Sequence, residues 1–147
     1  MADSLRSQGI RCVIVTPEST VLDTTARGVI LPLDDGLRGV ARGHAPCIGR
    51  LGAGEVRLAS SEAVQGNGEH DSQSVFIEGG FVEVAHDQVT VITQRAVPVE
   101  KLDPEAARSR LERVRSEKAV GEEAIVAKER ELATARAAMK ASRRAAR

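Results

Sequence analysis

The chain has 147 residues, 21 basic and 21 acidic side chains, and two aromatic residues, Phe76 and Phe81. This length fits one domain or a small domain with an appendage, and its core has to be built from Val, Ile, Leu and Ala. Proteins that read single-stranded nucleic acids stack bases on aromatic side chains, so the composition argues against that class. We also expect a soluble, unexported protein, because the start lacks an apolar signal region and no stretch is long enough to span a bilayer.

The segment from Arg11 to Val99 carries the pattern of β-strands. Its stretches "CVIVT", "GVILPL", "GEVRLAS" and "SVFIEGGFVEVA" alternate or are β-branched, and Gly, Pro and Asp separate them. In "FVEVAHDQVTVIT", His86 and Asp87 divide two alternating runs, which predicts a tight hairpin turn with left-handed backbone conformations. About eight to ten short strands at this spacing predict a β-sandwich or barrel.

After Val99 the composition becomes helical, so we expect two domains, residues 10–99 and residues 100–147. Asp103 is the expected N-cap of a first helix, with Pro104 at its first position, and this helix should reach about Lys118. Gly121 should break the helical segment, and a second helix should reach about Ser142. The predicted apolar stripes are Ala107, Leu111 and Val114 on the first helix, and Ile125, Leu132, Ala135 and Met139 on the second.

Charge is unevenly distributed between these two parts. Residues up to Glu100 carry 8 basic and 13 acidic side chains, whereas those from Lys101 onward carry 13 and 8. The basic end could bind nucleic acid or an acidic protein as a free-standing interaction module, or it could be a solvated helix face. We do not expect nucleic-acid binding, because aromatic residues are missing and acidic residues share the same part of the chain.

Candidate chemical sites are weak. His44 and Cys47 have the spacing of half a metal site, with Cys12, His70 or His86 as further ligands, but structural zinc sites need two close-spaced ligand pairs. His44 and Cys47 should point to opposite faces of an extended segment, which disfavours cysteine catalysis. Asp34-Asp35 and the glycine-rich "GRLGAGE" have turn compositions. We therefore expect no catalytic residues, no metal and no cofactor, and we expect Cys12 and Cys47 to be buried, reduced thiols.

The order of these segments resembles the epsilon subunit of the rotary F-type ATP synthase, which is called delta in mitochondria. The likeness runs from Arg11 to about Met139. Its most specific parts are Gly39-Val40 followed by Gly43-His44-Ala45-Pro46, the Gly79–Val84 hairpin with Val89-Thr90-Val91, and the helical opening "LDPEAARSRLE". The chain departs from the family at Arg42, where the family usually has a proline.

This resemblance implies a ten-stranded β-sandwich followed by a helical hairpin, in a non-catalytic rotor subunit that links the gamma subunit to the c-ring in proton- or sodium-driven ATP synthesis. It implies a peripheral location, through the complex, at the cytoplasmic face of the bacterial inner membrane. The implied rotor interface comprises Leu37, Arg38, Gly39, Val40, Arg42 and His44.

The resemblance further implies that the hairpin inhibits ATP hydrolysis, with the catalytic alpha and beta subunits as additional partners. The residues give this role an independent basis: the break at Gly121 would let the connection change shape, and the second helix carries a cationic set suited to acidic loops, namely Arg130, Arg136, Lys140, Arg143 and Arg144. Some family members also bind ATP on the hairpin, but here Ala106 stands where that pattern has an arginine. We therefore expect ATP binding to be weaker than millimolar or absent, because the planar guanidinium that pairs with phosphate is missing.

Overall fold

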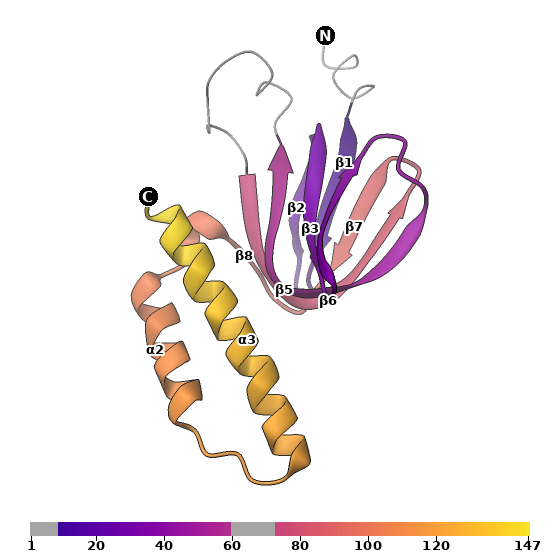
Figure 1. Ribbon diagram of the computed structural model, residues 1–147. Coiled ribbons are helices and arrows are strands. Elements are labelled where there is room, and N and C mark those ends of the chain that lie inside the picture. The colour runs from indigo at the N-terminus through magenta and orange to yellow at the C-terminus, as the bar shows by residue number, and fades with distance from the viewer. Residues whose placement is uncertain (1–8, 60–72) are drawn as a thin grey trace. The chain divides into compact units, whose positions relative to one another are not determined.

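A computed structural model of the chain describes residues 9–59 and 73–147. The chain divides into two compact units, one up to Val97 and one from Pro98 (Figure 1). The first unit is built from strands and the second from helices. Each unit is described separately below.

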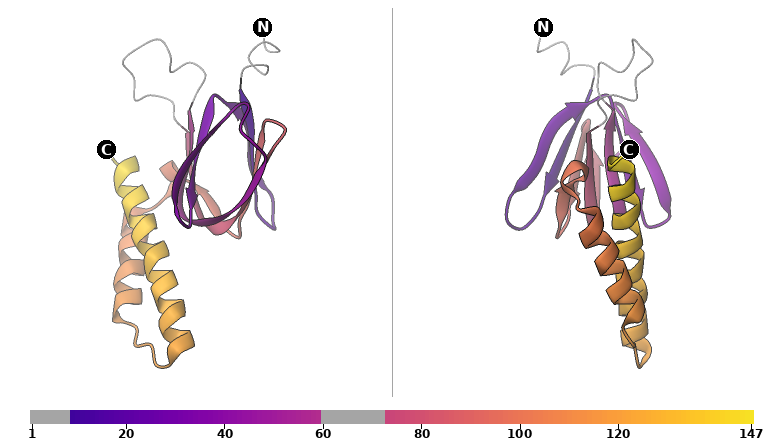
Figure 2. Two further views of the ribbon diagram at one scale, coloured as in Figure 1. Left: turned by 45° about the vertical axis from the view of Figure 1, so that its right-hand side comes forward. Right: turned by 90° about the vertical axis from the view of Figure 1, so that its left-hand side faces the viewer.

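The first unit is a β-sandwich. Its strands are β1 (Ile10–Val15), β2 (Thr20–Ala26), β3 (Gly28–Leu33), β4 (Gly36–Ala41), β5 (Cys47–Ala59), β6 (Gln73–Ala85), β7 (Gln88–Ile92) and β8 (Ala96–Pro98). They form one hydrogen-bonded sheet in the order β2-β1-β7-β6-β5-β3-β4, and β8 pairs with β6. The pairing of β1 with β7 is parallel, whereas β1–β2, β3–β4, β3–β5, β5–β6 and β6–β7 are antiparallel. The sheet folds over on itself, so that its strands form the two layers of a sandwich (Figure 2).

The eight strands of the described residues lie within the predicted eight to ten, and two long strands account for the difference from ten. On β5 the buried side chain is at Leu51 in the first half and at Val56 and Leu58 in the second, so the inward positions change from odd to even. On β6 the core residues change likewise, from Val75 and Ile77 to Val82 and Val84. Because successive side chains of a strand alternate between faces, each change marks a bend within a continuous strand.

The bend in β6 contains Gly79 and Gly80, whose φ angles are +80° and +118°. A Cβ atom at Gly80 would overlap the carbonyl oxygen of Ile92 and lie 3.0 Å from that residue's carbonyl carbon. Glycine is therefore required here both by the backbone conformation and by the close approach of β7. This explains why the "GG" pair stands in the middle of an otherwise β-branched and aromatic segment.

The core between the layers is aliphatic, as the composition predicts. It contains Val, Ile and Leu side chains together with Ala26 and Cys12, and Ile10, Ile14, Val56, Val89 and Val91 are fully buried. At the far end of β6, His86 and Asp87 adopt φ angles of +51° and +56° between the paired residues Ala85 and Gln88. The predicted two-residue hairpin turn is confirmed.

The second unit is a helical hairpin. It begins with a short 3₁₀ turn (η1, Val99–Lys101) and continues with α2 (Pro104–Ser116) and α3 (Glu122–Ala145). The Asp103 side chain accepts a hydrogen bond of 3.0 Å from the backbone N–H of Glu105, and Pro104 is the first helical residue. The predicted N-cap is confirmed. Gly121, with a φ of +92°, immediately precedes α3 and stands where the break was expected.

The apolar stripe of α3 differs from the prediction. Ala135 is buried, but Leu132 and Met139 are only partly buried and Ile125 is exposed. The other buried positions of α3 are Ala138, Ala141 and Ser142. The contact surface of α3 is therefore made of small side chains towards its C-terminal end, where Ala allows close approach but contributes little apolar area.

Candidate functional site

The residues predicted to form an interface lie on β4 and on the turn that follows it. Leu37 is 71% exposed, and Arg38 and Gly39 are also exposed. Val40 is 2% exposed and belongs to the core, so its side chain anchors β4 and cannot meet a partner directly. The strand thus presents three of the four predicted residues to solvent.

Ala41 to His44 form a tight turn, closed by a hydrogen bond of 3.1 Å from the His44 backbone N–H to the Ala41 carbonyl oxygen. Its central residues are Arg42 and Gly43, and the φ of Gly43 is +84°. A positive φ at the third position of a turn is the reason that glycine stands there. His44 is only half-buried, with Nδ1 2.7 Å from the Ala45 carbonyl oxygen.

A carboxylate 44 positions further along the chain, that of Asp87, braces this turn. The Gly43 backbone N–H donates a hydrogen bond of 2.7 Å to Asp87 Oδ1, and Arg42 Nε lies 3.7 Å from Asp87 Oδ2. From the sequence, Asp87 is expected only in the hairpin turn. The contact depends on the pairing of β5 with β6, which sets Cys47 beside Val84 and so brings the two turns together.

A second exposed feature, which the sequence pattern does not predict either, is an apolar row across β5, β6 and β7. Phe81 is 54% exposed and pairs in register with Ile92, which is 56% exposed. On the other side Phe81 pairs with Arg50, whose guanidinium lies 5.9 Å from the centre of the Phe81 ring. Ile48, two residues from Arg50 on the same face of β5, is 79% exposed. Clustered exposed apolar side chains are typical of interaction surfaces.

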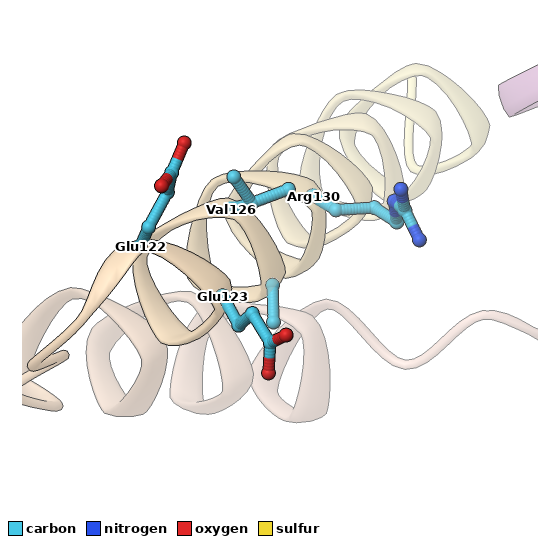
Figure 3. A pocket seen from close by; sticks show the side chains of 5 residues that line it. Glu122, Glu123, Val126 and Arg130 are labelled. Carbon is cyan, nitrogen blue, oxygen red and sulfur yellow. The ribbon is translucent and has the colours of Figure 1, made fainter.

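The predicted regulatory cations of α3 are all exposed: Arg130, Arg136, Lys140, Arg143 and Arg144. Arg136, Lys140 and Arg144 recur at four-residue steps, which places them on one face of the helix. Arg130 also lines an open pocket of about 500 Å³ on the first turns of α3, together with Glu122, Glu123, Val126 and Ala127 (Figure 3).

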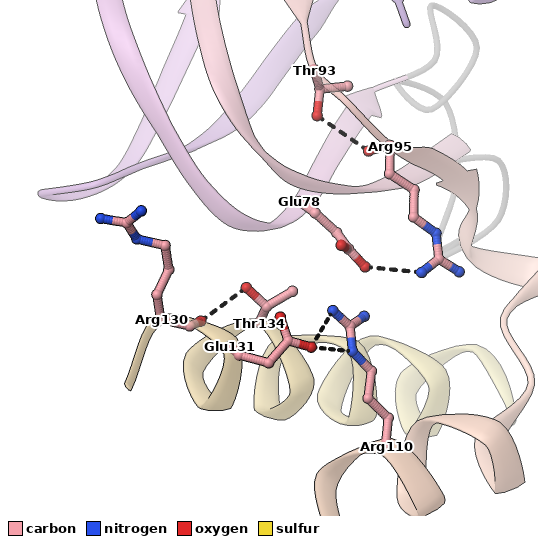
Figure 4. A network of polar contacts seen from close by, with 7 residues as sticks. All are labelled: Glu78, Thr93, Arg95, Arg110, Arg130, Glu131 and Thr134. Carbon is pink, nitrogen blue, oxygen red and sulfur yellow. Dashed lines mark hydrogen bonds and ion pairs between the residues drawn. The ribbon is translucent and has the colours of Figure 1, made fainter. Parts of the chain in front are cut away.

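Polar contacts hold the two helices together. Arg110 of α2 donates from Nε to Glu131 Oε1 of α3 at 2.8 Å, and Arg110 Nη2 lies 2.7 Å from the same oxygen (Figure 4). Lys128 of α3 donates through Nζ to the carbonyl oxygens of Glu117 and, at 3.4 Å, Arg115. A cation at these carbonyls complements the negative end of the α2 dipole.

The two cysteines differ in their surroundings. Cys12 is fully buried, and burial raises the pKa of its thiol to about 12, with a smaller contribution from the charge of Asp23. Cys47 is only partly buried at the start of β5, so the expectation that both would be buried is wrong for Cys47. It still packs against the core, because its side chain points inward on the same parity as Leu51.

Within residues 9–59 and 73–147, no three His, Cys, Asp or Glu side chains gather as metal ligands would. His44 lies in one turn and His86 in another, and His70 is outside the described residues. None of the helices in the described parts has both the length and the apolar character needed to cross a bilayer.

A β-sandwich with an exposed apolar row and a braced turn, joined to a helical hairpin, has the features of an interaction module. The comparisons with known proteins give the family. The family described as ATP synthase, Delta/Epsilon chain, beta-sandwich domain matches residues 9–99, and the chain belongs to it.

Similar proteins agree with this assignment. The ATP synthase epsilon chain of Rhodopirellula baltica is 50% identical over 98 residues, which cover 67% of this chain and 70% of the relative. That of Myxococcus xanthus is 39% identical over 98 residues, covering 67% and 66%. The matches therefore span about two thirds of each relative.

A solved structure supports the fold. A chain in the structure of the Euglena gracilis mitochondrial ATP synthase, comprising OSCP, F1 and c-ring, matches with a TM-score of 0.74 at 22% identity, covering 91% of this chain and 81% of that one. The similarity includes the helical part as well as the sandwich.

Proposed function

We propose that this chain is a non-catalytic rotor subunit of an F-type ATP synthase, which links the gamma subunit to the c-ring during proton- or sodium-driven ATP synthesis. The observation that carries the proposal is the family match over residues 9–99. A chain of the Tetrahymena thermophila central stalk and c-ring structure also has a similar fold, with a TM-score of 0.69. The subunit would lie at the cytoplasmic face of the bacterial inner membrane and associate with it through the complex.

The surface proposed for this role combines two features of the sandwich. One is the segment with Leu37, Arg38, Gly39, Arg42 and His44, for which buried Val40 is the anchor. The other is the apolar row of Ile48, Phe81 and Ile92. Both are solvent-accessible on a sheet whose core is complete, so they are available for partners without rearrangement of the fold.

Replacing one exposed residue of the row tests this role. Ile48→Ser removes apolar contact area from a side chain that is 79% exposed, so the thermal stability of the isolated chain should change little. Co-purification with the gamma subunit and c-ring should decrease. Val120→Ser is the matched control, since Val120 is 89% exposed but lies in the helical unit. A wild-type chain that captures neither gamma nor c-ring would support the free-standing interaction module instead.

We further propose that the sandwich, residues 10–99, and the hairpin, residues 100–147, are separate domains, and that the hairpin is a switchable brake on ATP hydrolysis. The 13 and 24 residues of α2 and α3 correspond to about 20 and 36 Å of helix, so a straightened hairpin would reach about 55 Å. Opening at Gly121 would give up an Ala-rich contact and a few polar links, which costs little apolar burial. The cations Arg130, Arg136, Lys140, Arg143 and Arg144 would then meet acidic surfaces of the catalytic alpha and beta subunits.

The Arg110–Glu131 pair provides a test with the full-length chain. Arg110→Glu and Glu131→Arg each place like charges together across the two helices, so each variant should favour the open hairpin and strengthen inhibition of ATP hydrolysis in the reconstituted complex. The double variant restores opposite charges and should return inhibition towards the wild-type level. Inhibition should weaken at high salt. Equal hydrolysis rates in all four complexes would show that the hairpin is a passive element.

A further inference from the structure

We propose that Asp87 is a positioning residue, which fixes the Ala41–His44 turn in the conformation that contacts the gamma subunit and the c-ring. The inference rests on the proposed function of that turn and adds a residue from outside it. Asp87 lies 44 positions from Gly43 along the chain, yet its carboxylate contacts both central residues of the turn. No other contact with the Gly43 backbone N–H is found among the described residues.

Asp87 is itself held in place. It occupies a two-residue hairpin turn with a φ of +56°, between the paired residues Ala85 and Gln88. Its carbonyl oxygen accepts a hydrogen bond of 3.0 Å from the backbone N–H of Arg11 on β1. The backbone of Asp87 is thus fixed by its own hairpin and by a neighbouring strand, so its carboxylate is presented from a rigid support.

The braced turn needs an external restraint. Gly43 can adopt many backbone conformations, and Arg42 before it lacks the ring with which a proline at this position would fix φ. The internal bond of the turn uses the N–H of His44, which leaves the N–H of Gly43 without a partner inside the turn. At 2.7 Å, the bond from this N–H to a carboxylate has the short length of a charge-assisted hydrogen bond. Asp87 therefore supplies from a neighbouring hairpin the restraint that the turn lacks.

The two contacts of Asp87 contribute unequally to holding the turn. The Arg42 and Asp87 side chains are 54% and 45% exposed, and a half-exposed ion pair at 3.7 Å is weak because water screens it. The hydrogen bond to Gly43 is shorter and acts on the backbone itself. We therefore assign the positioning role to the bond with Gly43 and expect the Arg42 pair to add little to it.

Three variants separate these contributions without disturbing the hairpin turn. Asp87→Asn keeps a side-chain oxygen for the Gly43 N–H and tolerates a positive φ, but it loses the charge. Asp87→Gly also fits the positive φ and removes both contacts. Arg42→Gln removes only the ion pair. Thermal unfolding of each variant verifies that the sandwich remains folded.

The first measurement, made on the isolated chain, is the solvent exchange rate of the Gly43 amide by NMR. In Asp87→Gly this rate should rise on the order of tenfold, while the Arg11 amide, which bonds to the backbone of residue 87, stays unchanged. In Asp87→Asn and Arg42→Gln the Gly43 rate should stay within about twofold to threefold of wild type. An unchanged Gly43 rate in Asp87→Gly would overturn the positioning role.

The second measurement is affinity for a reconstituted gamma and c-ring subcomplex. Asp87→Gly should bind on the order of tenfold more weakly than wild type, and Asp87→Asn should restore most of the affinity, because it keeps the bond to Gly43. If exchange accelerates in Asp87→Gly but affinity is unchanged, the turn is not a rotor contact, and the functional half of the inference is wrong. If the wild-type chain does not bind, the proposed function fails, and the exchange rates still decide whether Asp87 holds the turn.

Discussion

The bend of β6 makes a quantitative prediction about stability. Replacing Gly80 by alanine forces an L residue into a φ of +118° and places a Cβ against the backbone of Ile92 and Thr93, with carbons at 3.0 Å. Neither neighbour is a flexible side chain, so the strain can be relieved only by moving β7 or by straightening the bend. Either movement disturbs the pairing of Phe81 with Ile92 and hence the exposed apolar row.

The magnitude follows from two contributions. The strained backbone conformation costs about 1–3 kcal/mol. Moving β7 weakens ladder hydrogen bonds, each with a net contribution of about 1 kcal/mol, and loosens core packing around them. Gly80→Ala should therefore lower the free energy of unfolding by about 3–5 kcal/mol, a large part of the ~5–15 kcal/mol of a typical domain.

Denaturant unfolding followed by far-ultraviolet circular dichroism measures this, because the chain has no Trp or Tyr to report by fluorescence. Two controls separate the contributions. Gly36→Ala also places an alanine at a positive φ, of +131°, but its Cβ would have no atom within 4 Å, so this variant should show the backbone strain alone. Gly39→Ala meets neither obstacle and should stay within about 0.5 kcal/mol of wild type. If Gly80→Ala destabilises the protein no more than Gly36→Ala, the close approach of β7 does not constrain this position.

Three further outcomes are expected. In the native protein at neutral pH, a thiol reagent should label Cys47 well before Cys12, since burial raises the pKa of Cys12 to about 12; equal rates would contradict the buried environment. Asp103→Ala should destabilise the hairpin by about 1 kcal/mol and Asp103→Asn by much less, as measured by the helical signal on heating. The hydrogen bond from Arg11 lowers the pKa of Asp23 in the folded protein. The Arg11–Asp23 pair therefore stabilises the fold fully above pH 3.8, the ordinary pKa, and this stabilisation is lost as the pH falls through the lowered pKa. In the Arg11→Gln variant the pKa of Asp23, measured by NMR titration, should rise back towards 3.8.

Features with local causes could be predicted from the sequence. The His86–Asp87 turn and the Asp103 cap each depend on a few adjacent residues whose conformational preferences act in the same direction. The spacing predicts about eight to ten strands, and the described residues form eight. The exact number could not be predicted in the same way, because β5 and β6 each continue through a change of inward parity, so that a count of ten treats each of these two bent strands as two.

Features that depend on strand register or on how far two helices lie side by side could not be predicted from the sequence. The bond between Asp87 and Gly43 exists because β5 and β6 pair in one particular alignment, which no local pattern specifies. The exposure of Ile125 has a different cause, since α3 has 24 residues and α2 only 13. Beside the first turns of α3 the chain is no longer helical, so apolar periodicity alone overestimates what is buried there.

The parallel pairing of β1 with β7 has a consequence for the order of folding during synthesis. Cys12 of β1 aligns with Val89 of β7, so β1 can pair with β7 only when nearly the whole sandwich has been translated. Until then β1 can pair with β2, but its other edge is open and its apolar residues Ile10 and Ile14 lack their final surroundings. Closing so long a loop delays the last pairing, and the nascent chain must stay protected from edge-to-edge association on the ribosome until Ile92 has emerged.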